Sequence, residues 1–148
     1  MLKVESRWFL SQHCAFMGYM VNFGATVFPS SSGAASALKH SDIACMNLLK
    51  QSPVIPAVKD EDALRRALDC ESRAVFLLGG DLLRIGQWIA TTHEAEKQAI
   101  VHLDLVGGLA PKEVAVDWLQ QQGADGLIST RPHLIRRGRE NKMMTVLR

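Results

Sequence analysis

The sequence predicts an α/β fold in which about five parallel strands alternate with helices. From residue 46 onward, short apolar runs alternate with longer segments in which apolar residues recur at helical spacing. Each apolar run ends in small or polar residues before the next helical segment begins. Strict alternation of this kind is typical of a parallel sheet whose strands are joined by crossover helices. We therefore place one domain in residues 46–148.

The strands are predicted where apolar residues are continuous, and the helices where they recur every three or four positions. The predicted strands cover residues 53–58, 73–80, 97–108, 124–130 and 142–148. The predicted helices cover residues 59–69, 82–96, 110–123 and 131–141. Pro111 lies near the start of the third helix, and Val114, Trp118 and Leu119 are expected to face inward. Gly138 is expected to weaken the last helix.

The composition is that of a globular protein and argues against several functional classes. The chain has 148 residues, of which 47% are hydrophobic and 22% charged, and its net charge of +2 is too small to indicate nucleic-acid or membrane binding. Cys14, Cys45 and Cys70 show no metal-ligand or disulfide pattern, which favours a reducing cytoplasm. No dinucleotide-binding glycine motif, catalytic triad or metal cluster is recognisable, so we predict no cofactor and no metal.

Residues 1–45 differ in character from the rest of the chain. An apolar segment at 8–28 is followed by a linker rich in Ser, Gly and Ala. The segment loosely resembles a signal peptide, but polar residues interrupt it and its uninterrupted run is too short to span a bilayer. We therefore predict no membrane association.

The stretch IVHLDLVGGL, residues 100–109, places an imidazole and a carboxylate within an apolar strand. Side chains alternate along a strand, so His102 and Asp104 are expected to share one face, with Asp104 nearer the carboxyl end. A buried carboxylate is unfavourable unless it meets a ligand, a cation or several N–H donors. The alternative is that the two side chains simply satisfy each other and nearby backbone groups. Because Gly107 and Gly108 allow close approach by a ligand, we favour a binding site.

Two other strand ends carry polar residues. Gly79-Gly80-Asp81 closes the second predicted strand, and Ser129-Thr130-Arg131 closes the fourth. Arg131 is a candidate anion-binding residue at the start of a helix. Asp81 and Thr130 can equally be helix N-caps, and Arg131 a solvated residue. The carboxyl ends of parallel strands lie at one edge of the sheet, where such folds place their functional residues.

A basic cluster near the end of the chain consists of Arg136, Arg137, Arg139 and Lys142. Closely spaced cations of this kind can contact RNA phosphates. No aromatic residues are interleaved for base stacking, so a solvated helix face is the slightly favoured interpretation.

Several stretches together resemble one family, the glycerol-3-phosphate-responsive antiterminators, also called glycerol uptake operon antiterminators. The resemblance extends from about Gln51 to the end of the chain. The matching stretches are QSPVIPAVKDEDAL (51–64), AVFLLGGDLL (74–83), IVHLDLVGGL (100–109), GADGLISTR (123–131) and MMTVLR (143–148).

The resemblance implies a cytoplasmic, TIM-barrel-like regulator that is not an enzyme. Such a protein binds glycerol 3-phosphate and then the leader of a target messenger RNA, and so prevents premature termination of glycerol-utilisation transcripts. The ligand-binding residues expected from the strand ends are His102, Asp104, Ser129, Thr130, Arg131 and Asp81.

The resemblance also implies two departures from the family. Residues 1–45 match nothing in it, and its members begin at a point corresponding to Met46; we expect residues 1–45 to be poorly ordered or to be upstream sequence read in frame. The chain ends at the fifth predicted strand, whereas the family continues through a complete barrel. We therefore expect an incomplete barrel that binds glycerol 3-phosphate weakly and self-associates through open sheet edges.

Two rival functions are left open. The first is a phosphosugar-type isomerase or lyase in which Asp104 acts as acid or base. The second is an RNA or protein assembly module that uses residues 136–142 or the apolar segment 8–28.

Overall fold

The computed structural model describes residues 19–22, 47 and 54–148. Within these residues the chain forms one sheet with the strand order β1 to β6. The strands are β1 (Tyr19–Asn22), β2 (Val54–Val58), β3 (Ala74–Leu77), β4 (Gln98–His102), β5 (Gly126–Ser129) and β6 (Met144–Leu147). The α-helices are α2 (Glu61–Leu68), α3 (Ile85–Glu94), α4 (Glu113–Gln121) and α5 (Pro132–Glu140), and a short 3-10 helix, η1, covers Leu103–Leu105.

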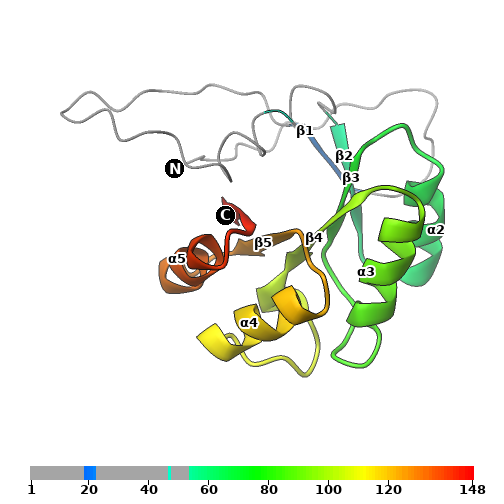
Figure 1. The fold of residues 1–148 in the computed structure, drawn as a ribbon. Coiled ribbons are helices and arrows are strands. Elements are labelled where there is room, and N and C mark those ends of the chain that lie inside the picture. The colour runs from blue at the N-terminus through cyan, green and yellow to red at the C-terminus, as the bar shows by residue number, and fades with distance from the viewer. Residues whose placement is uncertain (1–18, 23–46, 48–53) are drawn as a thin grey trace.

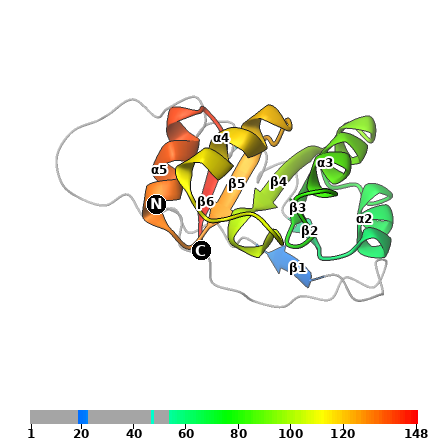
Figure 2. The same ribbon diagram turned by 90° about the horizontal axis from the view of Figure 1, so that it is seen from below.

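Strands β2 to β6 are parallel, and each pairs with its neighbour in chain order. The helices that connect them lie along one side of the curved sheet in the same succession (Figures 1 and 2). This arrangement follows from the right-handed crossover that joins parallel strands. The predicted α/β fold with five parallel strands is confirmed, and its description as an incomplete TIM-like barrel stays a prediction.

Strand β1 was not anticipated by the sequence analysis. Tyr19–Asn22 pairs antiparallel with β2, so that Tyr19 lies opposite Ala57. The other residues of segment 1–45, including most of the apolar segment 8–28, lie outside the described residues, and the expectations for that segment stay predictions. None of the helices in the described part of the chain is both long enough and apolar enough to cross a membrane.

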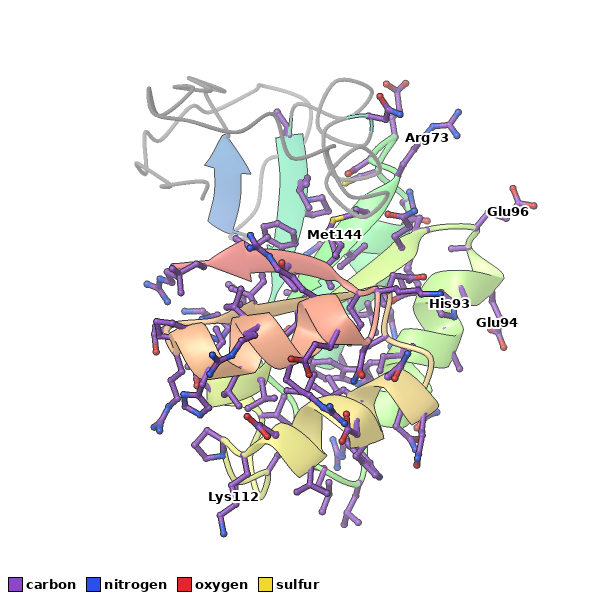
Figure 3. The ribbon with its side chains drawn as sticks, turned by 60° about the vertical axis from the view of Figure 1, so that its left-hand side comes forward. Arg73, His93, Glu94, Glu96, Lys112 and Met144 are labelled. Carbon is purple, nitrogen blue, oxygen red and sulfur yellow. The ribbon has the colours of Figure 1, made fainter. Side chains whose placement is uncertain are left out.

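The parallel strands bury apolar side chains on both faces, as continuous apolar runs predict. One face packs against the helices through residues such as Val75, Val101 and Leu127. We call the opposite face the inner face. Its buried residues are Ile55, Ala57, Ala74, Phe76, Ile100, Ile128, Met144 and Val146. Met144 on β6 points away from α5, as Figure 3 shows.

Two predicted boundaries were wrong. The strand expected at 97–108 ends at His102, and the chain then turns into η1. The helix expected from 110 begins only at Glu113, so Pro111 precedes it. Its buried stripe comprises Ala115, Val116 and Leu119, which leaves Val114 69% exposed. The inward position of Val114 is therefore wrong, because the buried side of the helix is turned away from that residue.

Gly138 plays the opposite role to the one expected. It is buried in α5, and a Cβ at this position would lie 2.9 Å from Thr145 Cγ2 and 3.1 Å from Leu127 Cδ2. The missing side chain lets α5 pack directly against β5 and β6.

We expect Gly138→Ala to lower the free energy of unfolding by roughly 1–2 kcal/mol, because overpacking outweighs the gain in helix propensity. Gly86 in α3 is the matched control, since a Cβ there meets only the end of the exposed, flexible Gln122 side chain. Gly86→Ala is therefore expected to be neutral or mildly stabilising. Urea unfolding of both variants tests the pair, and equal effects at the two positions would contradict the packing argument.

Candidate functional site

The candidate site lies where strands β4 and β5 end. Asp104 sits in η1, immediately after β4, while Ser129 is the last residue of β5 and Thr130 and Arg131 lead into α5. Because neighbouring parallel strands end at the same edge, these residues come together although about 25 positions separate them. We call Asp104, Ser129, Thr130 and Arg131 the Asp104 cluster.

One oxygen of the Asp104 carboxylate ties the two loops together. Oδ2 accepts hydrogen bonds from Ser129 Oγ at 2.9 Å, from the Thr130 backbone N–H at 2.8 Å and from Thr130 Oγ1 at 3.3 Å. The Ser129 hydroxyl oxygen in turn accepts from the Arg131 backbone N–H at 3.1 Å. The carboxylate therefore fixes both the end of β5 and the residue that precedes α5.

The other oxygen, Oδ1, has an open acceptor position. It is buried and has no hydrogen-bond partner among the described residues. The Arg131 Nε lies 3.4 Å away, close enough for an ion pair. The Arg131 side chain is 51% exposed, whereas the Asp104 side chain is only 15% exposed. Oδ1 can thus receive a hydroxyl donor from a small molecule.

The Asp104 carboxyl group is held in its charged form. Burial alone raises its pKa, but the hydrogen bonds from the Thr130 backbone and the Ser129 hydroxyl, together with the nearby His102, bring the pKa below its usual value. A carboxylate with a lowered pKa accepts hydrogen bonds at neutral pH and repels anions.

His102 lies beside this cluster on the inner face of β4. Its side chain is 2% exposed, and neither ring nitrogen has a hydrogen-bond partner among the described residues. The Nδ1 atom is 3.9 Å from Asp104 Oδ2, beyond hydrogen-bond range. The two side chains therefore do not hydrogen-bond each other, whereas the Thr130 backbone N–H satisfies part of Asp104, as the alternative also expected. Strand alternation is also not what brings them close, because Asp104 lies in η1 rather than on the strand.

The pKa of His102 is lowered. Burial is the largest cause, and the positive charge of Arg148 acts in the same direction, while the charge of Asp104 opposes both. At neutral pH the ring is therefore uncharged, with one donor and one acceptor nitrogen.

Asp81 lies apart from the Asp104 cluster in its contacts. Its Oδ1 accepts from the backbone N–H groups of Leu83 at 2.9 Å and Arg84 at 3.0 Å, which stabilises the turn before α3. A backbone bridge joins Asp81 to Gly107, so the loops after β3 and β4 are adjacent. No contact among the described residues links its carboxylate to Asp104. Thr130 is not the N-cap of α5, because Arg131 occupies that position.

The basic cluster lies toward the far end of α5 and is divided in its contacts. Arg137 donates to both oxygens of Asp117, at 2.8 and 3.0 Å, and to Glu140 at 3.1 Å, and these contacts raise its pKa. Its charge is thus already paired. Arg136, Arg139 and Lys142 are exposed, and Arg139 Nε donates to Thr145 Oγ1 at 3.3 Å.

The opposite end of the sheet holds a pair that the sequence analysis missed. His93 Nε2 lies 2.8 Å from Asp125 Oδ2, which also accepts from the backbone N–H of Ala99. In Figure 3, His93 and Glu96 lie at the end from which the strands start. The pair ties α3 to the beginning of β5, which indicates a structural role at that end. A histidine in a last helical turn and an aspartate before a strand were the available signals.

Arg148 is the other residue that the sequence analysis missed. It follows β6, and its backbone N–H donates to the carbonyl oxygen of Ser129 at 3.1 Å. It therefore lies at the same edge as the Asp104 cluster. No group of three or more His, Cys, Asp or Glu side chains that could hold a metal ion occurs within residues 54–148.

Comparisons with known proteins agree on one family. The glycerol-3-phosphate responsive antiterminator family matches residues 54–148. YgcP from Escherichia coli (strain K12) is 37% identical over 95 residues, which cover 64% of this chain and 50% of the relative. The chain thus spans about half the length of this curated relative.

Two solved structures are also similar. The glycerol uptake operon antiterminator regulatory protein from Listeria monocytogenes superimposes with a TM-score of 0.61 at 26% identity, over 63% of this chain and 51% of that one. A glycerol uptake operon antiterminator-related protein from Thermotoga maritima gives a TM-score of 0.58 at 30% identity, over 63% and 52%. The family match covers all five parallel strands and the whole Asp104 cluster. The chain belongs to the glycerol-3-phosphate responsive antiterminator family.

Proposed function

We propose that the protein is a cytoplasmic transcription antiterminator that responds to glycerol 3-phosphate and binds the leader RNA of glycerol-utilisation genes. The family match supports a regulatory role. The names of the two similar structures point to glycerol uptake. The proposal describes the activity of a whole family member, and the match spans about half the length of the curated relative.

The observation that carries the proposal is the unfilled hydrogen-bonding capacity at the Asp104 cluster. Asp104 Oδ1 and both ring nitrogens of His102 are buried without hydrogen-bond partners among the described residues, and the contact of Oδ1 with Arg131 is an ion pair. Unpartnered buried polar atoms are unfavourable and call for an explanation, and a ligand rich in hydroxyl groups supplies it. Arg131, at the edge of the cluster, supplies a cation for an anionic group. Among the other predicted ligand residues, Ser129 and Thr130 hold Asp104 in place, and Asp81 shapes the neighbouring loop.

The rival function as an isomerase or lyase is less favoured. A general acid or base works best when its pKa lies near the operating pH. The pKa of Asp104 is displaced away from that range, and its Oδ2 is occupied by three hydrogen bonds. The cluster is therefore better suited to binding than to proton transfer, and we propose that the protein is not an enzyme.

For RNA we assign the exposed members of the basic cluster, Arg136, Arg139 and Lys142. Arg137 is excluded because its charge is paired with Asp117 and Glu140. Arg136 and Arg139 lie on α5 and Lys142 follows its end, whereas the Asp104 cluster precedes the helix, so we propose that ligand and RNA are bound together. The rival function as an assembly module, with self-association through sheet edges, stays a second prediction, since β6 is the last strand of the described sheet.

The test is binding of leader RNA at fixed salt, with and without glycerol 3-phosphate. We expect glycerol 3-phosphate to tighten binding, and the double variant Arg136→Glu and Arg139→Glu to weaken it by about tenfold or more, because phosphate contacts dominate RNA affinity. The control carries the same charge change at two exposed residues elsewhere, Arg66→Glu and Lys112→Glu, and should bind nearly as the wild type does. RNA binding that ignores glycerol 3-phosphate would favour the assembly module instead.

A further inference from the structure

The strand register aligns side chains in rows across the inner face of the sheet. His102 pairs with Ile128, and Ile128 pairs with Val146, so these three residues form one row. Ile128 and Val146 are buried on the inner face. Because side chains alternate along a strand, Thr130 and Arg148 occupy the next row toward the carboxyl ends. Arg148 is therefore on the same face as His102, one row closer to the edge.

Two further observations place Arg148 at the site. Its backbone N–H bonds to the Ser129 carbonyl, so the pairing of β5 and β6 continues through this residue. Its charge also acts on the buried imidazole of His102, whose pKa it lowers. The Arg148 residue is exposed at the edge of the sheet. A cation thus faces the same small region as the Asp104 cluster, from the strand next to it.

The site carries charges of both signs, and Arg131 lies next to Asp104. Asp104 supplies one negative charge, whereas Arg131 and Arg148 supply two positive charges. His102 is uncharged at neutral pH, since burial and Arg148 lower its pKa. One cation is left over after Asp104 is paired, which suits a ligand with a net negative charge. That negative charge cannot lie against Asp104, because like charges repel.

The unfilled hydrogen-bonding atoms lie beside the Arg131 cation, since its Nε is 3.4 Å from Asp104 Oδ1. Asp104 Oδ1 accepts but cannot donate, and a neutral imidazole offers one donor and one acceptor. Two hydroxyl groups on adjacent carbons match this set: one donates to Oδ1, and the other exchanges hydrogen bonds with His102.

We propose that Arg148 and Arg131 bind the phosphate of a small polyol phosphate, whose hydroxyl end lies against Asp104 and His102. The proposal rests on the proposed function and deepens it, because it fixes the orientation of the ligand and adds Arg148 to the site. It also predicts which part of the ligand each residue recognises.

The test compares glycerol 3-phosphate with propyl phosphate, which keeps the phosphate but lacks both hydroxyl groups. Titrations of the full chain measure the affinity of the wild type and of three variants, Arg148→Gln, Arg131→Gln and Asp104→Asn, for both ligands. We expect each arginine variant to lose about tenfold or more in affinity for both ligands, because each removes a charge-assisted contact to phosphate. We expect Asp104→Asn to weaken the binding of glycerol 3-phosphate much more than the binding of propyl phosphate. Arg66→Gln, an exposed arginine on α2, controls for the general loss of positive charge.

The possible outcomes separate this inference from the proposed function. If the wild type binds glycerol 3-phosphate and Arg148→Gln binds it equally well, the inference is wrong and the proposed function stands. If Asp104→Asn weakens both ligands equally, the assigned orientation is wrong. If the wild type binds neither ligand, the glycerol 3-phosphate response and the inference both fail. Thermal unfolding of Arg148→Gln checks that the exposed substitution leaves the fold intact.

Discussion

Replacing Asp104 with alanine is expected to lower the free energy of unfolding by roughly 2–4 kcal/mol at pH 7, since each hydrogen bond to a charged group contributes about 1.5–3 kcal/mol and neighbouring bonds are not additive. The carboxylate accepts from Ser129 Oγ and from the N–H and hydroxyl of Thr130. Its loss leaves these donors without their acceptor at the start of α5.

The matched control is Asp117→Ala. Asp117 also accepts several hydrogen bonds, from Arg137 and Asn141, but it is more exposed than Asp104. Ion pairs in such exposed positions contribute little to stability. Urea unfolding of the two variants should therefore show a clearly larger loss for Asp104→Ala. Equal losses would mean that the hydrogen bonds of Asp104 do not stabilise the fold more than those of Asp117.

The dependence of this effect on pH has a definite sign. The pKa of Asp104 is lower in the folded chain than in the unfolded chain. The carboxylate therefore stabilises the fold above its unfolded pKa, and that contribution is lost as the pH falls through the folded pKa. The gap between wild type and Asp104→Ala should persist at pH 5 and close only in strong acid, below the usual range for a carboxyl group.

Most of the parallel sheet was predictable from residues alone. The apolar runs at 73–80 and 124–130 contain β3 and β5. These strands could be located from sequence because a strand that is buried on both faces appears as a continuous apolar run. The predicted end of the strand at Gly108 was wrong because η1 also contains apolar residues, and its composition does not distinguish a tight turn from a strand. Strand β1 was missed for another reason. It is defined by its pairing with β2, a long-range contact that the local sequence pattern cannot show.

The residues of the Asp104 cluster could be predicted to lie together at one edge of the sheet, but their contacts could not. Motif and strand-end position identified Asp104, Ser129, Thr130 and Arg131. Sequence could not show that one carboxylate oxygen takes every hydrogen bond while the other is left open, because that depends on the angle at which η1 leaves β4.

The position of Arg148 and the pairing of Arg137 could not be predicted from the sequence, for a related reason. Arg148 belongs to the site only through the register of β5 and β6. Arg137 was grouped with its basic neighbours, although its partner Asp117 lies on α4, twenty positions earlier. Spacing along the chain cannot distinguish a paired cation from a solvated one.

His102→Leu is expected to stabilise the fold by about 1–3 kcal/mol at neutral pH, although it should abolish ligand binding, because it replaces an unpartnered buried polar group with an apolar one of similar size. The ring lies on the inner face next to Ile100 and Ile128, so a leucine continues the apolar surface there. His102 thus lowers the stability of the fold, but its two ring nitrogens can form hydrogen bonds with a ligand. Such a trade-off between stability and function is common at binding sites.

The pH dependence provides a second readout of the same substitution. The pKa of His102 is lowered in the folded chain. The unfolded chain therefore takes up a proton more readily, and stability falls as the pH drops from about 6.5, the ordinary pKa of a histidine, toward the folded pKa. This slope is at most about 1.4 kcal/mol per pH unit for one proton. The advantage of His102→Leu over wild type should thus grow between pH 7.5 and pH 5.5.

Urea unfolding across this pH range, together with titration of glycerol 3-phosphate at pH 7.5, measures both effects. His133→Gln, a substitution at an exposed position on α5, controls for the loss of a histidine at the surface. A less stable His102→Leu would mean that the imidazole has a partner that stabilises it, and so would remove the main reason for assigning His102 to the ligand. A stabilised variant that has lost binding would show that the chain keeps an unfavourable buried imidazole because the ligand requires it.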